Sequence, residues 1–168
     1  MLLACLLPIP FVAFAVLGYF IFKDSKIDFW EVDGVKKFYM NMAFVSDYKG
    51  GQEREQRVRY TLTGEKHKAD NVPHNRGADC LHYQIKSARA TVCKGLDLIE
   101  YIRQDAATEF IYATKTDIAY IMSRDEYTEF CLTFGTITRE SQKNGGGEKI
   151  RLKSESQTLL EWLRIRAG

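Results

Sequence analysis

A two-residue repeat of bulky apolar side chains marks the part of the chain that follows its N-terminal segment. In residues 38–45, one set of alternate positions carries Phe38, Met40, Met42 and Phe44. The pattern recurs among polar neighbours at Val58, Tyr60 and Leu62. Because successive side chains of a β-strand point to opposite faces, this alternation predicts strands with one face toward a core. We therefore expect a fold built mainly of strands.

Further short strand-like segments follow, separated by turns. Apolar and aromatic residues favour strands at 81–92, 109–114, 117–123 and 127–139, with a bulge or hairpin near Ser87. Turn-forming residues indicate a long loop at 64–79, whereas 96–103 fits either a helix or a strand. Ser154 and Gln157 resemble a capping box, and the leucines that follow predict a short C-terminal amphipathic helix.

This order of elements favours an antiparallel barrel or sandwich. Parallel strands need long crossover connections, and the sequence shows no regular alternation of strands with long helices. A chain of 168 residues is long enough for one core beyond its N-terminal segment. We expect a single β-rich domain at residues 27–168.

Residues 1–22 contain no charged side chain and are almost entirely apolar. As a helix this run would extend about 30 Å, which is enough to cross a bilayer. It is either a signal peptide, with a small-x-small pattern at residues 13–15, or a retained transmembrane anchor. Both readings place the domain in the secretory pathway, secreted or anchored on the non-cytoplasmic side. Lys23 and Lys26 conflict with this, since the positive-inside rule would leave the domain in the cytoplasm.

Three stretches carry a family resemblance. The segment from Ile27 to Tyr39 stands where lipocalins enter their first strand, with Phe38 near the position of the family's Trp. Residues 116–120 partly match a late turn motif, and Arg139, with Arg124 as its rival, matches the arginine beneath the barrel. Together with the C-terminal helix, they resemble the lipocalin and calycin superfamily, including the arthropod salivary lipocalins. The resemblance implies an antiparallel β-barrel that holds one ligand.

Such a barrel would bind a small apolar or amphipathic ligand without catalysis. Its inward face would carry bulky apolar side chains around a cavity. The candidate ligand-binding residues are Phe38, Met40, Phe44, Tyr60, Tyr83, Tyr112 and Tyr120. The same residues would also suit an ordinary packed core.

The sequence lacks the motifs of common catalytic, metal and cofactor sites. His67, His74 and His82 are too irregularly spaced for a zinc pair on one helix. No nucleophile elbow, P-loop or dinucleotide fingerprint is present in the sequence. The 24 basic residues are scattered among 22 acidic ones, which leaves no strong field to attract nucleic acid. We therefore expect no enzyme activity, no cofactor, no metal and no nucleic-acid partner.

The cysteines leave their pairing open. Cys80 and Cys93 flank Ser87 at similar distances along the chain, so a hairpin there would let them form a disulfide. A bridge from Cys80 to Cys131 fits equally well. In a reducing compartment, all three would instead be small buried side chains.

A second function class is a structural role in a membrane. Residues 1–22 would then be the single span of an accessory subunit, and the β-rich domain would brace the other subunits of a membrane complex. A carrier needs an internal cavity, whereas a brace needs an exposed apolar patch and a retained helix.

Overall fold

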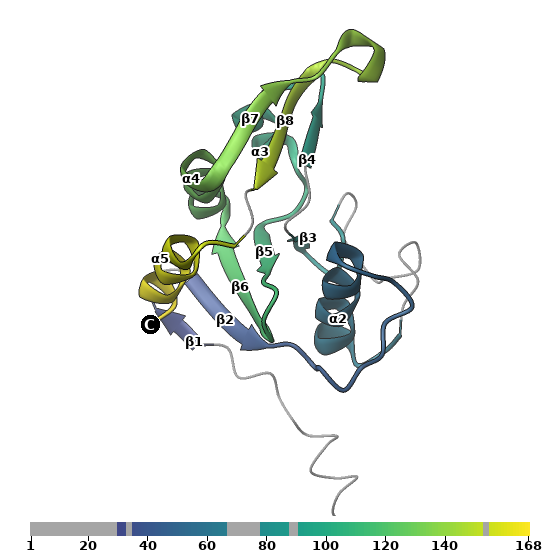
Figure 1. The fold of residues 1–168 in the computed structure, drawn as a ribbon, viewed down its shortest axis with the longest axis vertical. Helices are drawn as coiled ribbons and strands as arrows, with labels where there is room; N and C mark the ends of the chain where they lie inside the picture. The colour runs from purple at the N-terminus through teal and green to yellow at the C-terminus, as the bar shows by residue number, and fades with distance from the viewer. Residues whose placement is uncertain (1–29, 33–34, 67–77, 88–90, 153–154) are drawn as a thin grey trace, which may run out of the picture.

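The computed structural model describes residues 30–32, 35–66, 78–87, 91–152 and 155–168. In chain order the elements are β1 (Trp30–Val32), β2 (Val35–Tyr39), α2 (Gly51–Thr63), β3 (Tyr83–Lys86), β4 (Thr91–Lys94), α3 (Leu98–Gln104), β5 (Glu109–Ala113), β6 (Ile118–Ser123), α4 (Arg124–Phe134), β7 (Gly135–Arg139), the 3-10 turn η2 (Gln142–Asn144), β8 (Gly147–Leu152) and α5 (Gln157–Ala167). The strands form two separate sheets, one of five strands and one of three (Figure 1).

The five-stranded sheet has the order β1-β2-β6-β5-β3. Its neighbours run antiparallel except β3, which pairs parallel to β5 with Ile85 opposite Ile111. The chain returns from β3 to β5 through β4 and α3, which supply the crossover that parallel pairing requires. β5 and β6 lie inside the sheet with both faces covered, and for this reason their sequences are almost continuously apolar.

Two apolar cores cover the two faces of this sheet. The core beneath α2 contains Val58 and, from the strands, Phe38, Ile85, Ile111 and Ile121. The opposite core lies beneath α3, α4 and α5. The buried side chains of this core include Phe110, Tyr112, Tyr127, Phe130 and Leu163. Figure 1 shows α2 on one side of the strands and α5 on the other. Because helices pack on both faces of the sheet, both faces are filled by side chains.

The three-stranded sheet has the order β4-β8-β7, all antiparallel, and extends to one end of the molecule (Figure 1). Its inner face adds Cys93, Ile150 and Leu152 to the core beneath α4. Gly147 begins β8 with a φ of +82°, and a Cβ at this position would collide with the backbone oxygen of Cys93. Glycine is therefore required where β8 joins β4.

The expected lipocalin-like β-barrel is wrong. The described residues form two small open sheets and four helices, and neither sheet closes on itself. The reason is the parallel β3–β5 pair with its crossover, together with helices on both faces. The fold is of mixed α/β content and is not mainly β.

The strand expected over residues 57–63 is a helix, α2. Three alternating apolar residues also satisfy a helical pattern, because Val58 and Leu62 are four positions apart and share one helix face. Arg57 pairs with Glu53 one turn earlier at 2.8 Å, an arrangement that favours a helix. The strand expected from residue 38 onward ends at Tyr39, and turns follow it.

The strand expected over 127–139 begins only at Gly135, because residues up to Phe134 form α4. Ser123 accepts a hydrogen bond from the backbone N–H of Glu126, whose side chain accepts one from the backbone N–H of Ser123. This capping box fixes the start of α4, and Tyr127, Phe130 and Cys131 then share its buried face.

The C-terminal helix is confirmed as α5, although its N-cap is Ser156, which accepts a hydrogen bond from the backbone N–H of Leu159. The ambiguous segment 96–103 is largely helix α3. No helix of the described residues is long and apolar enough to span a bilayer. The segment for which that helix was expected, residues 1–22, lies outside the described residues.

Candidate functional site

The free edge of β3 carries the first component of the site. Beyond Asp79 the chain reverses through Leu81, a non-glycine residue with a φ of +53°, and enters β3 at Tyr83. The backbone N–H of Asp79 donates to the oxygen of Tyr83 at 3.0 Å. The Asp79 carboxylate accepts from the backbone N–H of Ile85 at 2.9 Å. A carboxylate is thereby fixed on the strand edge, where a further strand would otherwise pair.

α2 supplies a second carboxylate. Glu55 lies in the middle of this helix, and its Oε1 accepts a hydrogen bond from the Ser87 hydroxyl at 2.9 Å. Ser87 directly follows β3 and is buried. This bond connects the helix to the end of β3.

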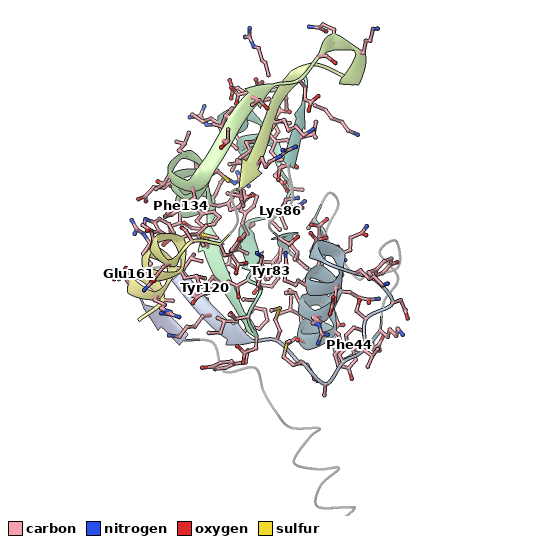
Figure 2. The ribbon with its side chains drawn as sticks, in the orientation of Figure 1. Phe44, Tyr83, Lys86, Tyr120, Phe134 and Glu161 are labelled. Atoms are coloured by element: carbon pink, nitrogen blue, oxygen red, sulfur yellow. The ribbon has the colours of Figure 1, made fainter. Side chains whose placement is uncertain are left out.

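β3 itself supplies a cation. Lys86 ends the strand, and its Nζ lies 3.9 Å from Oδ2 of Asp79. Its side chain is 17 % exposed and that of Asp79 is 30 % exposed, so solvent and small solutes reach both. Figure 2 shows Lys86 where the five-stranded and three-stranded sheets meet.

These three side chains line one cavity of about 280 Å³. The remainder of its wall comes from β3, β4 and α3, namely Ile85, Ser87, Thr91, Val92 and Tyr101. Two carboxylates and one ammonium group thus converge on a single pocket at the junction of the two sheets. We call Glu55, Asp79 and Lys86 the junction site.

The charges of the junction site influence one another. Burial raises the pKa of Glu55, and the nearby Asp79 carboxylate raises it further, whereas Ser87, Arg59 and Lys86 oppose the shift. Burial also raises the pKa of Asp105, which is close enough to feel both Lys86 and Asp79. Burial raises the pKa of Tyr101 to about 12, and the nearby Asp105, Cys93 and Asp79 add to the shift. Burial is thus the largest cause of each shift, and a bound cation would offset the charge of the two carboxylates that line the pocket.

Unfilled acceptor positions remain beside this pocket. Asp79 and Glu55 each use one carboxylate oxygen in the bonds described above, and among the described residues no protein donor reaches the other oxygen. Gln84, two positions before Lys86 on β3, also has a buried Oε1 without a hydrogen-bond partner in the described part of the chain, although Gln84 is not part of the cavity wall. Oxygen acceptors of this kind are ligands for hard cations such as Mg²⁺.

The described residues contain no cluster of three or more His, Cys, Asp or Glu side chains suited to a metal ion. A zinc or calcium cage is therefore not formed by the part of the chain that the structure describes. Mg²⁺ makes a smaller demand, because it commonly keeps several waters and binds through one or two carboxylates together with substrate phosphate. The junction site meets that smaller demand.

The seven candidate ligand-binding residues do not surround one cavity. Phe38, Met40 and Tyr83 belong to the core beneath α2, whereas Tyr112 and Tyr120 belong to the opposite core. Phe44 stacks on Tyr60 with ring centroids 4.3 Å apart, beside the end of α2. Among these residues, Met40 lines a second cavity of about 120 Å³ in the described part of the chain.

The other candidate groups have structural surroundings. Cys80, Cys93 and Cys131 are buried free thiols, so the disulfide expected between Cys80 and Cys93 is not formed in this structure. His82 pairs with Glu109 at 2.9 Å near the surface. His67 and His74 lie outside the described residues. Arg124 donates to the backbone oxygens of Asp105 and Ala107, at 3.0 and 2.8 Å, and so anchors the start of α4.

Sequence reasoning missed all three residues of the junction site. Glu55 was hidden because its segment was expected to be a loop and strand, and Asp79 was counted as part of a long loop. One signal was present: Gln84 and Lys86 are polar residues at alternate positions of a strand whose intervening Tyr83 and Ile85 are buried. Polar side chains on a second covered face of a strand indicate a site more often than a solvated surface. Comparisons of the chain with protein-family models, curated proteins and solved structures give no match.

Proposed function

We propose that the junction site binds Mg²⁺ or a similar divalent cation and hydrolyses a phosphate ester. The observation that carries this proposal is the convergence of Glu55, Asp79 and Lys86 on one cavity. The two carboxylates would hold the cation, and the lysine would hold the anion.

The carboxylates favour a cation of the Mg²⁺ type. Asp79 is fixed by Ile85 and Glu55 is fixed by Ser87, so each offers its second oxygen from a defined position. Two carboxylates, supplemented by water and substrate oxygens, are a usual Mg²⁺ coordination. When bound, such a cation makes a coordinated water more acidic and stabilises negative charge on a phosphoryl oxygen.

Lys86 favours phosphate chemistry over simple cation storage. In a site that only stores a cation, an ammonium group 3.9 Å from a ligand carboxylate would repel the bound cation. A phosphoryl transition state carries negative charge on its equatorial oxygens, and a lysine fixed nearby stabilises that charge. Besides its pair with Asp79, the Lys86 ammonium group would stabilise an anion that enters the cavity.

The cavity limits how much of a substrate it encloses. Its volume of about 280 Å³ is at the lower end of small-molecule sites, which span about 300–1,000 Å³. We infer that the phosphoryl group and its immediate substituents enter, while the remainder of the substrate lies outside. This requirement fits an ester with a small or extended alcohol portion better than a compact cofactor.

This proposal differs from the non-enzymatic carrier expected from the sequence. The described residues do not form the barrel expected for that carrier, and ligand carriage itself stays a prediction. The membrane-accessory alternative stays a prediction about residues 1–22.

Metal binding tests the first half of the proposal. Isothermal titration calorimetry with MgCl₂ should give saturable binding to the wild type, and Glu55→Gln and Asp79→Asn should each weaken it tenfold or more, about 1.4 kcal/mol. Glu161→Gln is the matched control, because Glu161 lies exposed on α5 outside the cavity. Equal Mg²⁺ affinity in all four folded proteins, or no saturable binding by any, would overturn the proposal.

A further inference from the structure

A second cavity carries an unbalanced positive charge. Its volume is about 120 Å³, and it lies between the first turns of α2, the chain after β2 and the turn between β5 and β6. Its wall contains three cationic side chains, Arg54, Arg57 and Lys115, against the single carboxylate of Glu53. The remaining wall residues are Met40, Met42, Gly50 and Thr116.

One of the three cations is already neutralised. The guanidinium of Arg57 donates to Oε1 of Glu53 at 2.8 Å and to the backbone oxygen of Met42 at 2.9 Å. This pair lowers the pKa of Glu53, which therefore stays ionised and directed toward Arg57. The charge of Glu53 is accordingly committed, and Arg54 and Lys115 make up the excess.

Arg54 lacks the partner that its position demands. Its Nε is buried and makes no hydrogen bond within the described residues. A buried donor without an acceptor costs roughly 1–3 kcal/mol, so native proteins seldom leave one unfilled unless an ion or ligand supplies the acceptor. The described residues therefore leave part of the Arg54 guanidinium without an acceptor.

Lys115 is held at the other side of the cavity by its backbone. Its N–H donates to both carboxylate oxygens of Glu155, at 2.7 and 2.9 Å, which fixes the turn between β5 and β6. Its ammonium group makes no ion pair among the described residues. Next to it, the Thr114 hydroxyl donates to the backbone oxygen of Ile118, so the Thr116 hydroxyl donates to Thr114 at 2.7 Å and is a fixed part of the wall.

We propose that this cavity, with Arg54 and Lys115 in its wall, binds the phosphate group of a small ligand. A guanidinium and an ammonium group are donor types that recognise phosphate oxygens. The cavity is large enough for a phosphate group and too small for a whole nucleotide. This second site is distinct from the junction site and does not depend on it.

Phosphate titration in the absence of metal tests the site without involving the junction site. Inorganic phosphate is titrated by calorimetry in EDTA at constant ionic strength, with the full chain. The wild type should bind it saturably, and Arg54→Met and Lys115→Met should each weaken binding tenfold or more. Lys143→Met, an exposed lysine in η2, is the control and should bind like the wild type.

Further measurements keep the proposal open to refutation. Circular dichroism identifies a variant that has lost its fold, and the second variant then decides the result. A parallel titration with phenyl phosphate distinguishes a free anion from an esterified phosphate, since only a site open to a substituent binds both. Absence of saturable binding by the wild type, or wild-type affinity in both folded variants, would overturn the proposal and leave the junction-site proposal intact.

Discussion

The carboxylate of Asp79 accepts a hydrogen bond from the backbone N–H of Ile85 at 2.9 Å. β3 is the last strand of its sheet, so without this bond the N–H would have no partner on the open edge. A side chain thus acts as the outer neighbour of a strand and at the same time presents its second oxygen to the cavity. Fold stability and the proposed chemistry share one residue.

This double role predicts a measurable cost of removing Asp79. Asp79→Ala leaves the buried Ile85 N–H without an acceptor, and we expect the free energy of unfolding to fall by about 1–3 kcal/mol in urea denaturation. Asp79→Asn keeps an acceptor oxygen and should lose clearly less. Asp47→Ala, which removes only an exposed pair with Lys66, is the control and should change little. A loss for Asp79→Ala no larger than for Asp47→Ala would contradict this role.

Glu55 predicts a pH dependence of stability. Burial raises the pKa of Glu55 in the folded protein, so the folded state binds the proton more tightly than the unfolded state. As the pH rises from the ordinary glutamate pKa through the raised one, stability is lost, and the cost is fully present above the raised value. Glu55→Gln removes this cost, and the variant should be more stable than the wild type at neutral pH without divalent metal.

The advantage of Glu55→Gln should disappear below the ordinary glutamate pKa of about 4.3, where the carboxyl is protonated in both states. Thermal unfolding at a series of pH values in EDTA measures it. Added Mg²⁺ should stabilise the wild type and not the variant, because only the carboxylate binds the cation. A stability difference that does not change with pH would show that Glu55 is not buried as described.

α4 depends on a local signal at its first turn. Ser123→Ala removes the hydrogen bond to the backbone N–H of Glu126 and should lower the free energy of unfolding by about 0.5–2 kcal/mol. Ser123→Asp keeps an acceptor and should retain most of the stability. Ser141→Ala is a suitable control, since Ser141 precedes η2 and makes no side-chain capping bond there. Equal thermal midpoints for the two alanine variants would contradict the capping role.

The sequence predicted the individual central strands and the last helix, and it failed where short-range patterns are degenerate. β5 and β6 are rich in β-branched and aromatic residues over five and six positions, and only a strand suits such runs. Val58, Tyr60 and Leu62 alternate as in a strand, but Val58 and Leu62 also share one face of a helix. The segment is helical, with Glu53 and Arg57 paired one turn apart and Val58 the fully buried residue of the three.

The arrangement of the strands could not be predicted by periodicity alone. The parallel pairing of β3 with β5 depends on contacts across a crossover of more than twenty residues, which no local pattern encodes. The junction site could not be predicted from local patterns either, because Glu55 and Asp79 approach each other only when α2 packs against β3. For the same reason the barrel was wrong even though several of its strands were correct.

The central claim is that Glu55 and Asp79 hold a cation while Lys86 stabilises a phosphoryl group. Its most direct measurement is the Mg²⁺-dependent hydrolysis of bis(p-nitrophenyl) phosphate by the wild type and by Lys86→Met, with Mg²⁺ affinity measured on the same samples. We predict metal-dependent release of p-nitrophenol that falls about a hundredfold in Lys86→Met, while Mg²⁺ binding is kept or strengthened. A wild type that binds Mg²⁺ without hydrolysing the ester, or a folded Lys86→Met with unchanged activity, would contradict the account.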